Sequence, residues 1–222
     1  MEKKFILTDK FVINSFGIKL FQIKCTKSFK YAQKGDFGGY VEKEGNLDQE
    51  NDAWVFGNAR VFGNARVSSN ARVSGDAWVS DNARVLGDAW VSDNAWVSSN
   101  AWVSGDALVS GYAWVSGDAR VFGNARVSGD AWVSGNAWVS GDADIENDNE
   151  HCGFDGFGSC NRHTHAYMTK EKKVEIICGC FRGSIEEFEK KVEETHSGTV
   201  YEKQYKSIIN VIKIKFGLID FT

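Results

Sequence analysis

A strict six-residue repeat fills the middle of this sequence and leaves few folds open to it. The repeat reads DAWVFG NARVFG NARVSS NARVSG and continues in the same phase to DADIEN. Alanine occupies every sixth position from Ala53 to Ala143, and valine follows two residues later from Val55 to Val139. A period of six matches no 3.6-residue helical stripe, and glycine together with β-branched valine disfavours a helix. An unstructured low-complexity tract would lack this strict Ala/Val phase.

Within each hexad the residues alternate, so alanine and valine point to one side and the residue between them points to the other. The alanine and valine side is small and nearly invariant, as a narrow interior requires. The next two residues are mostly Gly-Asp, Gly-Asn, Ser-Asn or Asp-Asn, which form turns. Each hexad is therefore a short strand and a corner, and three hexads close a triangular coil. The repeat predicts a mainly β fold, a parallel β-solenoid of about five to six coils stacked about 4.8 Å apart.

The outward position of the hexad carries tryptophan, arginine or, once, leucine, and all eight tryptophans occupy it. Since tryptophan and arginine replace one another freely there, we expect the position to face solvent. Grouping these positions by eighteen residues gives one ladder on each side of the prism. The first ladder is Arg60, Trp78, Trp96, Trp114 and Trp132; the second is Arg66, Arg84, Trp102, Arg120 and Trp138; the third is Trp54, Arg72, Trp90, Leu108 and Arg126.

Stacked indoles bury one another's faces, and arginine over tryptophan gains cation–π energy. One interpretation is that the ladders only stabilise the solenoid. The other is that a contiguous strip of exposed tryptophan is an interface, as such strips usually are. The serines two residues after the ladder positions have no base beside them, and we expect them to be plain strand surface. On the first side these are Ser80, Ser98, Ser116 and Ser134.

The rest of the composition excludes several classes of protein. The net charge of −4 gives no general basic footprint for nucleic acid. The sequence has no run of eighteen apolar residues, so no membrane span is predicted. The charged N-terminal stretch does not match a signal peptide. These features predict a cytoplasmic protein with no membrane partner, in which the five cysteines are thiols. Single-stranded nucleic acid, which stacks on aromatic platforms, is the weaker alternative as partner.

Both ends depart from the repeat and are expected to cap it, because a solenoid exposes a strand ladder at each end. Residues 1–36 predict a small β cap, with strands at 11–13 and 18–23. Residues 37–149 form the solenoid, with a linker at 146–150. Residues 150–222 predict an α+β domain with strands at 161–169 and 173–181. Ser184 opens a capping box and a helix, and a second helix follows.

The C-terminal domain also holds the one candidate metal site. His163 and His165 share one face of a predicted strand, and Cys178 and Cys180 share a face of the next. If the strands pair in register, the four side chains could surround a zinc ion. The alternative is that the thiols are small buried hydrophobes and the histidines lie at the surface. The sequence therefore predicts no cofactor, with zinc as the alternative.

The pattern V-S-G-D-A-W resembles the hexapeptide repeat of left-handed parallel β-helices, and the expected handedness comes from this resemblance alone. The stretch KGDFGGYVEKEGNLDQENDAWVFGNARV resembles the opening of phage and prophage hexapeptide-repeat proteins, which are often labelled putative transferases. The segment CGCFRGSIEEFEKKVEETHSG resembles the region that ends many of them. The resemblance implies a phage-type β-helix acting in the bacterial host cell.

We interpret the chain as a non-enzymatic scaffold whose ladders bind a host or phage protein or a second copy of the chain. The phage resemblance suggests, as a hypothesis, that the scaffold inhibits a host defence complex. An enzyme similar to hexapeptide acyltransferases is the alternative, but those enzymes usually use a histidine base near a coil or subunit boundary, and this chain has no histidine before His151. A virion or structural rod is the second alternative.

Overall fold

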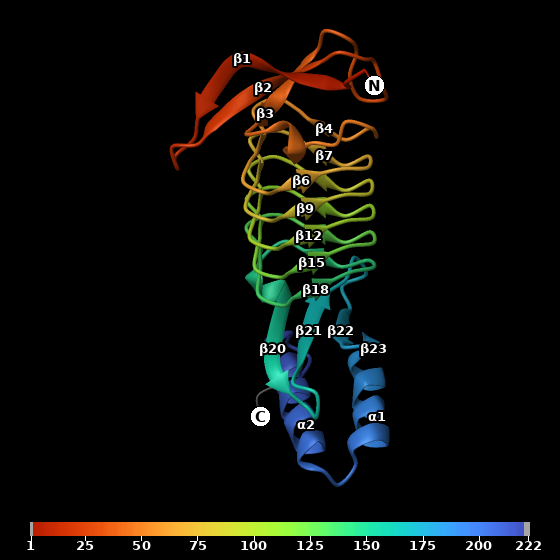
Figure 1. Cartoon of the computed structure of the whole chain (residues 1–222). Helices are drawn as coiled ribbons and strands as arrows, with labels where there is room; N and C mark the ends of the chain where they lie inside the picture. The colour runs from red at the N-terminus through yellow and green to blue at the C-terminus, as the bar shows by residue number, and fades with distance from the viewer. Residues whose placement is uncertain (1, 220–222) are drawn as a thin grey trace.

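The computed structural model describes residues 2–219 and has the shape of a rod (Figure 1). A β-solenoid of about six turns forms the middle of the rod. A β-hairpin lies at its N-terminal end, and a sheet with two helices lies at its C-terminal end. The predicted fold class, a mainly β solenoid with a small N-terminal region and a C-terminal α+β domain, is confirmed. None of the helices within residues 2–219 has the length and apolar composition needed to cross a bilayer.

Three parallel ladders of short strands form the sides of the solenoid, and within the repeat each strand pairs with the one eighteen residues away. The first side contains β3 (Phe37–Val41), β5 (Arg60–Val61), β8 (Trp78–Val79), β11 (Trp96–Val97), β14 (Trp114–Val115) and β17 (Trp132–Val133). The second contains β6 (Arg66–Val67), β9 (Arg84–Val85), β12 (Trp102–Val103), β15 (Arg120–Val121) and β18 (Trp138–Val139). The third contains β4 (Trp54–Val55), β7 (Arg72–Val73), β10 (Trp90–Val91), β13 (Leu108–Val109), β16 (Arg126–Val127) and β19 (Asp144–Ile145).

The interior of the solenoid consists of the alanines and valines that the repeat predicts. Every alanine from Ala53 to Ala143 and every valine from Val55 to Val139 is buried. Each coil is held to the next by backbone hydrogen bonds, such as the one from Trp96 N to Ala113 O at 2.9 Å. The interior side chains are small because the three strands of a coil approach one another closely. The backbone N–H and C=O groups of each short strand are satisfied by the strands of the neighbouring coils.

The corners of the coils contain residues with positive φ angles. Polar groups at a corner form hydrogen bonds with those at the same corner of the next coil. Asp93 has a φ of 59°, and its carboxylate accepts a hydrogen bond from the backbone N–H of Gly111 in the next coil at 3.1 Å. Amide side chains form a further chain along one corner, in which Asn64, Asn82 and Asn100 each donate to the next residue in the stack. The acidic and amide residues of the repeat therefore work as corner links.

The N-terminal hairpin extends the first side and covers the end of the solenoid. Strand β1 (Phe5–Ile13) pairs with β2 (Lys19–Cys25), which pairs with β3, and the short helix η1 (Glu44–Asn46) follows. The two predicted strands are confirmed, although β1 starts earlier than predicted. Trp54 is only 1% exposed, since the rings of Phe5 and Phe29 pack against it at 6.3 and 5.4 Å. The expectation that every outward position faces solvent is wrong at Trp54, because the cap covers the first coil.

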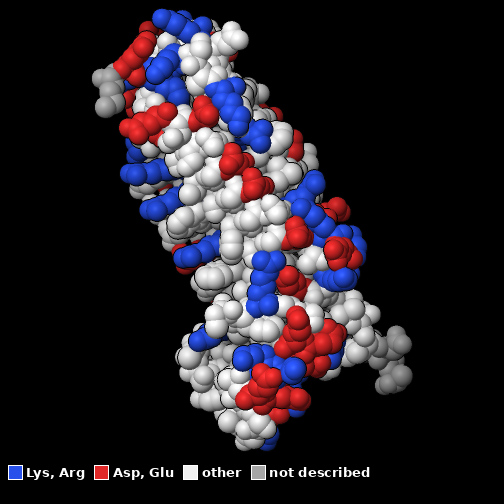
Figure 2. Space-filling model, turned by 90° about the vertical axis from the view of Figure 1, so that its right-hand side faces the viewer, with Lys and Arg blue, Asp and Glu red and all other residues white. Residues whose placement is uncertain are grey.

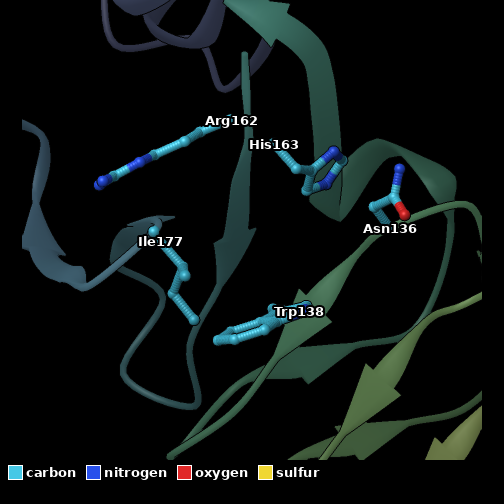
Figure 3. Close-up of a pocket in the computed structure, with 6 residues that line it drawn as sticks. Asn136, Trp138, Arg162, His163 and Ile177 are labelled. Carbon is cyan, nitrogen blue, oxygen red and sulfur yellow. The ribbon is translucent and has the colours of Figure 1, made fainter. Parts of the chain in front are cut away.

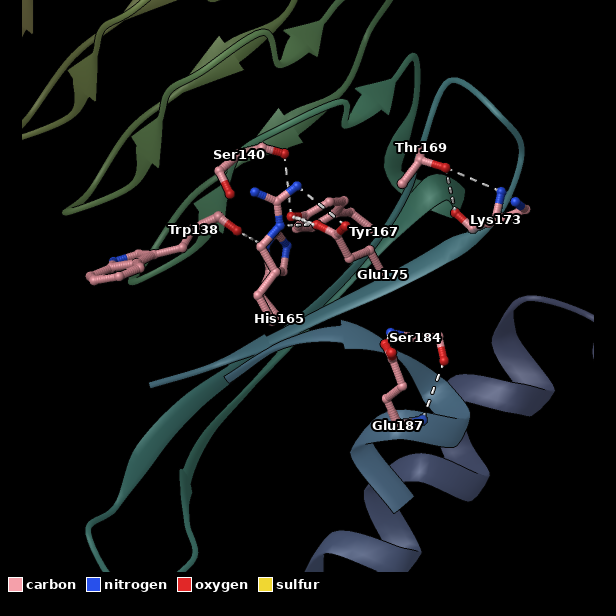
Figure 4. A network of polar contacts seen from close by, with 10 residues as sticks. Trp138, Ser140, His165, Tyr167, Thr169, Lys173, Glu175, Ser184 and Glu187 are labelled. Atoms are coloured by element: carbon pink, nitrogen blue, oxygen red, sulfur yellow. Dashed lines mark hydrogen bonds and ion pairs between the residues drawn. The ribbon is translucent and has the colours of Figure 1, made fainter. Parts of the chain in front are cut away.

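The C-terminal module is a four-stranded antiparallel sheet with two helices on one face. Its elements are η2 (Asp148–Glu150), β20 (His151–Phe157), β21 (Arg162–Met168), β22 (Val174–Cys178), β23 (Phe181–Ser184), α1 (Ile185–His196) and α2 (Val200–Lys215). The predicted capping box is present, with the Ser184 hydroxyl accepting from the N–H of Glu187 (Figure 4). The predicted linker is instead a short helical turn that leads directly into β20, a strand that was not predicted.

The module is joined to the last coil by hydrogen bonds from β21 and the turn that follows it. Tyr167 donates to the backbone oxygen of Ser140 at 3.3 Å and to the carboxylate of Glu175, as Figure 4 shows. Lys170 N donates to Asp142 O at 2.9 Å. The buried Tyr167 therefore ties the sheet to the end of the solenoid.

Candidate partner-binding surface

The first ladder forms a continuous aromatic column along one side of the solenoid. The indoles of Trp96 and Trp114 are parallel to within 6°, with ring centroids 5.1 Å apart, and those of Trp114 and Trp132 are parallel to within 5° at the same distance. Trp78 meets Trp96 edge to face at 5.8 Å, and the Arg60 guanidinium lies over Trp78 at 5.1 Å. All five residues of the predicted first ladder are therefore in contact in one column.

Serines of the preceding coil hold the indoles in place. The indole N–H groups of Trp96, Trp114 and Trp132 donate to the hydroxyls of serines sixteen residues earlier. These serines are Ser80, Ser98 and Ser116, at donor–acceptor distances of 3.1, 3.0 and 3.4 Å. They are buried under the indoles, whereas Ser134, which has Glu150 and not a tryptophan sixteen residues later, is exposed. The expectation that these serines are plain strand surface is wrong for the first three.

The turn of the N-terminal hairpin covers one half of this column. Residues 14–18 connect β1 to β2, and Figure 1 shows the hairpin standing to one side of the solenoid with its turn directed along it. The ring of Phe16 lies 6.1 Å from Trp78, 6.3 Å from Trp96 and 6.2 Å from Phe62. Phe16 was not predicted from the sequence to contact this column, although an aromatic residue in a predicted hairpin turn is the local signal for such a contact.

The other half of the column stays open. Trp132 is 49% exposed, and Trp114 is half-buried because it stacks between two indoles. No aromatic ring outside the ladder contacts either of them among residues 2–219. The ladder thus has a covered half next to the hairpin and an open half next to the C-terminal module.

The second ladder alternates cations with indoles rather than stacking indoles alone. The Arg120 guanidinium lies 5.8 Å from Trp102 and 5.2 Å from Trp138, and Arg84 lies 5.9 Å from Trp102. Trp102 and Trp138 are 36% and 38% exposed. Arg66 occupies the next position and pairs in register with Arg84. The side chains of this ladder are ordered by one another, and their cations remain accessible.

Charged side chains are unevenly distributed over the rod. In the view of Figure 2, which shows the side of the rod away from the hairpin turn, they gather at the N-terminal end and on one side of the C-terminal module and are sparser along the middle of the solenoid. The net charge of −4 does not favour binding of a polyanion.

The structure does not bring the four predicted zinc ligands together. Thr164, not a histidine, lies opposite Cys178 in the pairing of β21 with β22, and the Thr164 hydroxyl contacts the Cys178 sulfur at 3.3 Å. His163 and His165 therefore point to the opposite face of the sheet from Cys178. Cys180 lies beyond the end of β22 and is exposed. Within residues 2–219 no group of three or more potential ligands could hold a metal ion. The zinc site suggested for His163, His165, Cys178 and Cys180 is therefore wrong.

Instead, the histidines take part in the junction between the module and the solenoid. Figure 4 shows His165 beside Trp138, whose backbone oxygen lies 2.9 Å from His165 Nδ1; His165 Nε2 lies 3.1 Å from His151 Nδ1. Burial lowers the pKa of His165 to about 3 and also lowers the pKa of His151. His165 is therefore a neutral structural residue of the junction.

One comparison with known proteins bears on the solenoid. A family model described as the YdcK beta solenoid repeat matches residues 65–81, 77–93, 101–117 and 119–135. These segments lie within the repeat and cover less than half of the chain, so the chain is similar to that family in its solenoid. No curated protein matches the chain.

Proposed function

We propose that this protein is a non-enzymatic scaffold that binds another protein through the open half of the first ladder, with the second ladder beside it. The parallel stack of Trp96, Trp114 and Trp132 is the observation that supports this function best. Tryptophan is the residue most enriched among those that dominate binding energy, and contiguous exposed aromatic surface is uncommon on proteins that bind nothing.

The stack is also ordered before any partner binds. Each indole is fixed on both faces or on one face by stacking, and its N–H is already satisfied by a serine. Ordering a free side chain at an interface costs about 0.5–1.5 kcal/mol. A surface whose indoles are already ordered avoids much of that cost, which favours a binding role over a purely structural one.

The hairpin turn indicates what kind of group the ladder accepts. Phe16 seats an aromatic ring on Trp78 and Trp96 from a tight turn, and the open half of the ladder continues the same surface. We infer a partner that presents an apolar or aromatic side chain at a turn. Acidic side chains around that turn would complement Arg84 and Arg120 on the neighbouring side.

The resemblance of the chain to phage hexapeptide-repeat proteins suggests a specific form of this function. In that form the partner is a component of the bacterial host, and occupation of its surface by the rigid rod inhibits a defence complex. The rod suits such a role because a solenoid keeps its shape on binding and offers a long, flat contact surface.

Affinity capture from a bacterial host lysate, with three forms of the chain as baits, tests the proposal. The baits are the wild-type chain, the Trp114→Ser/Trp132→Ser variant and the matched control Trp90→Ser, which removes an exposed indole from the third ladder. We expect one protein to be retained by wild type and by the control and to be lost with the double variant. That protein, once purified, should bind the wild-type chain with a defined stoichiometry in calorimetry.

Sedimentation of the three baits alone separates the other outcomes. A wild-type dimer that becomes monomeric in the double variant would show that a second copy occupies the ladder, and would overturn the proposal of a foreign partner. Identical capture by all three baits would show that the open half of the ladder is not the contact surface.

A further inference from the structure

Two exposed cysteines lie in neighbouring turns at one end of the C-terminal sheet. Residues 158–161 join β20 to β21 and contain Cys160, whereas Gly179 and Cys180 join β22 to β23. Strands β21 and β22 are antiparallel neighbours, so both turns lie at the same end of the sheet. This end is opposite the turn at 169–173, which is bonded to the last coil. Both cysteines are free thiols that reach solvent.

A single guanidinium lies against both thiols. Arg162 begins β21 directly after the first turn, and its side chain crosses Gly179 of the second, where a Cβ atom would come within 2.5 Å of Nη1. Figure 3, a close-up of the pocket beside β18, shows this guanidinium directed away from His163. The pKa of Arg162 is raised, first by the charge of the Cys160 thiolate and then by hydrogen bonds to the sulfurs of Cys160 and Cys180. Thiols from two different turns are therefore within reach of one side chain.

The backbone holds both turns in place. The N–H of Gly158 in the first turn donates to Gln204 Oε1 of α2 at a distance of 3.0 Å. The second turn is tight, because Gly179 has a φ of 61° and Cys178 pairs with Phe181 across it. Each turn therefore presents its exposed cysteine from a fixed position.

The third cysteine of this region is much less accessible. Cys178 is 6% exposed, and its sulfur contacts the Thr164 hydroxyl at 3.3 Å and the Tyr205 hydroxyl at 3.7 Å. A reagent in solution therefore meets Cys160 and Cys180 first. Thiol–disulfide exchange needs such access, and a neighbouring cation favours the thiolate that attacks.

We propose that Cys160 and Cys180 are a reversible redox pair, which a low-molecular-weight disulfide such as oxidised glutathione converts to an intramolecular disulfide. One protein thiolate attacks a sulfur of the reagent, forms a mixed disulfide and releases one thiol. The second protein thiolate attacks the protein sulfur of that mixed disulfide, forms the internal S–S bond and releases the second thiol. The protein loses two protons and two electrons, which the reagent takes up as it becomes two thiols.

The surroundings of the two thiols permit this closure. Arg162 is exposed, so its side chain can move into solvent as the two sulfurs approach each other. The bridge would tie the two turns together and close this end of the sheet. The inference does not rest on the proposed partner surface, because neither turn contains a residue of the three ladders.

Intact-mass measurement of the full chain after reaction with oxidised glutathione tests the pair. We expect the mass to fall by two hydrogens. The chain has five cysteines, so a maleimide added after denaturation should label the three outside the bridge, and all five once dithiothreitol has reduced it. The oxidised chain should also unfold at a higher urea concentration than the reduced chain, because a bridge restricts the unfolded state.

Variants assign the two sulfurs. Cys160→Ser and Cys180→Ser should each stop at the mixed disulfide and form no internal bridge. Cys152→Ser is the matched control, since it removes a partly buried thiol of β20, and it should form the bridge as wild type does. Urea unfolding of the reduced proteins checks that each variant is folded.

Four results would overturn the pair. These are no reaction of the wild-type chain, a glutathione adduct that does not resolve to a bridge, an internal bridge that persists in Cys160→Ser or Cys180→Ser, and a disulfide-linked dimer in place of the internal bridge.

Discussion

The indole N–H of Trp114 donates a hydrogen bond to the hydroxyl of Ser98, sixteen residues earlier and one coil away, at a distance of 3.0 Å. The same relationship recurs at neighbouring coils of the first ladder. It links the two kinds of outward position in the hexad, between which the repeat pattern predicts no contact. Because of it, the tryptophans lie against the solenoid in one fixed orientation.

Removing one of these hydroxyls should destabilise the solenoid measurably. Ser98→Ala leaves the Trp114 N–H without its partner in a buried position, and a lost hydrogen bond of this kind costs about 1 kcal/mol. Ser134→Ala is the matched control, since Ser134 has the same place in its hexad but no tryptophan above it, and should change stability by less than about 0.5 kcal/mol. Urea unfolding measures both. Equal effects of the two substitutions would contradict the role assigned to Ser98.

The inward positions should tolerate no charge. Val97 is fully buried in the interior, so Val97→Asp places an unpaired carboxylate there and should prevent folding of the chain. Arg66→Asp, at an exposed outward position, should leave the fold intact and relieves the repulsion with Arg84. Circular dichroism and gel filtration distinguish the two outcomes. A folded Val97→Asp protein would be inconsistent with the assigned interior.

Acidification should loosen the junction between the solenoid and the C-terminal module. The pKa of His165 is about 3 in the folded chain against an ordinary value of 6.5, so the unfolded chain binds the proton more tightly. The free energy of unfolding should therefore fall as the pH drops below about 6.5, by up to about 1.4 kcal/mol per pH unit.

Urea unfolding at pH 7 and pH 5 measures this effect while the carboxylates stay ionised. His165→Asn has no proton to gain, so its stability should change less over the same interval. If wild type and His165→Asn show the same pH dependence, His165 is not the group responsible.

The hairpin turn should shield the covered half of the first ladder. Phe16→Ser removes the ring that packs on Trp78 and Trp96, and those indoles should become more accessible to acrylamide quenching. Phe16 is itself 59% exposed, so we expect a loss of stability of no more than about 1 kcal/mol. Phe37→Ser, at an equally exposed ring on β3, is the control and should leave quenching unchanged. Unchanged quenching in Phe16→Ser would show that the turn does not cover the ladder in solution.

The repeat predicts the solenoid because one period sets strand, corner and interior together. Ala53 and Val55 fix the inward phase, and every later hexad keeps it. The predictions failed where contacts cross between segments that are distant in sequence. Trp54 has the pattern of a surface residue, yet Phe5 and Phe29 bury it. No local signal reports such a contact.

The C-terminal site shows a second limit of sequence reasoning. Alternation places His163 and His165 on one face of β21, as predicted, but the register of β21 against β22 decides which residues they meet. The turn between the strands sets Thr164 opposite Cys178, and a change of one residue would have reversed the result. The Phe16 contact was likewise hidden, because the path of the hairpin depends on how β2 joins β3.

Trp114 and Trp132 should form a binding surface without being needed for the fold. Calorimetric titration of the captured and purified protein against wild type and Trp114→Ser/Trp132→Ser, with urea unfolding of both chains, checks both properties. We expect binding to weaken at least about a hundredfold, the effect of losing a dominant interface residue, while unfolding remains cooperative. Wild-type affinity in the double variant, or failure of that variant to fold, would show that the two indoles are not a binding surface separate from the fold.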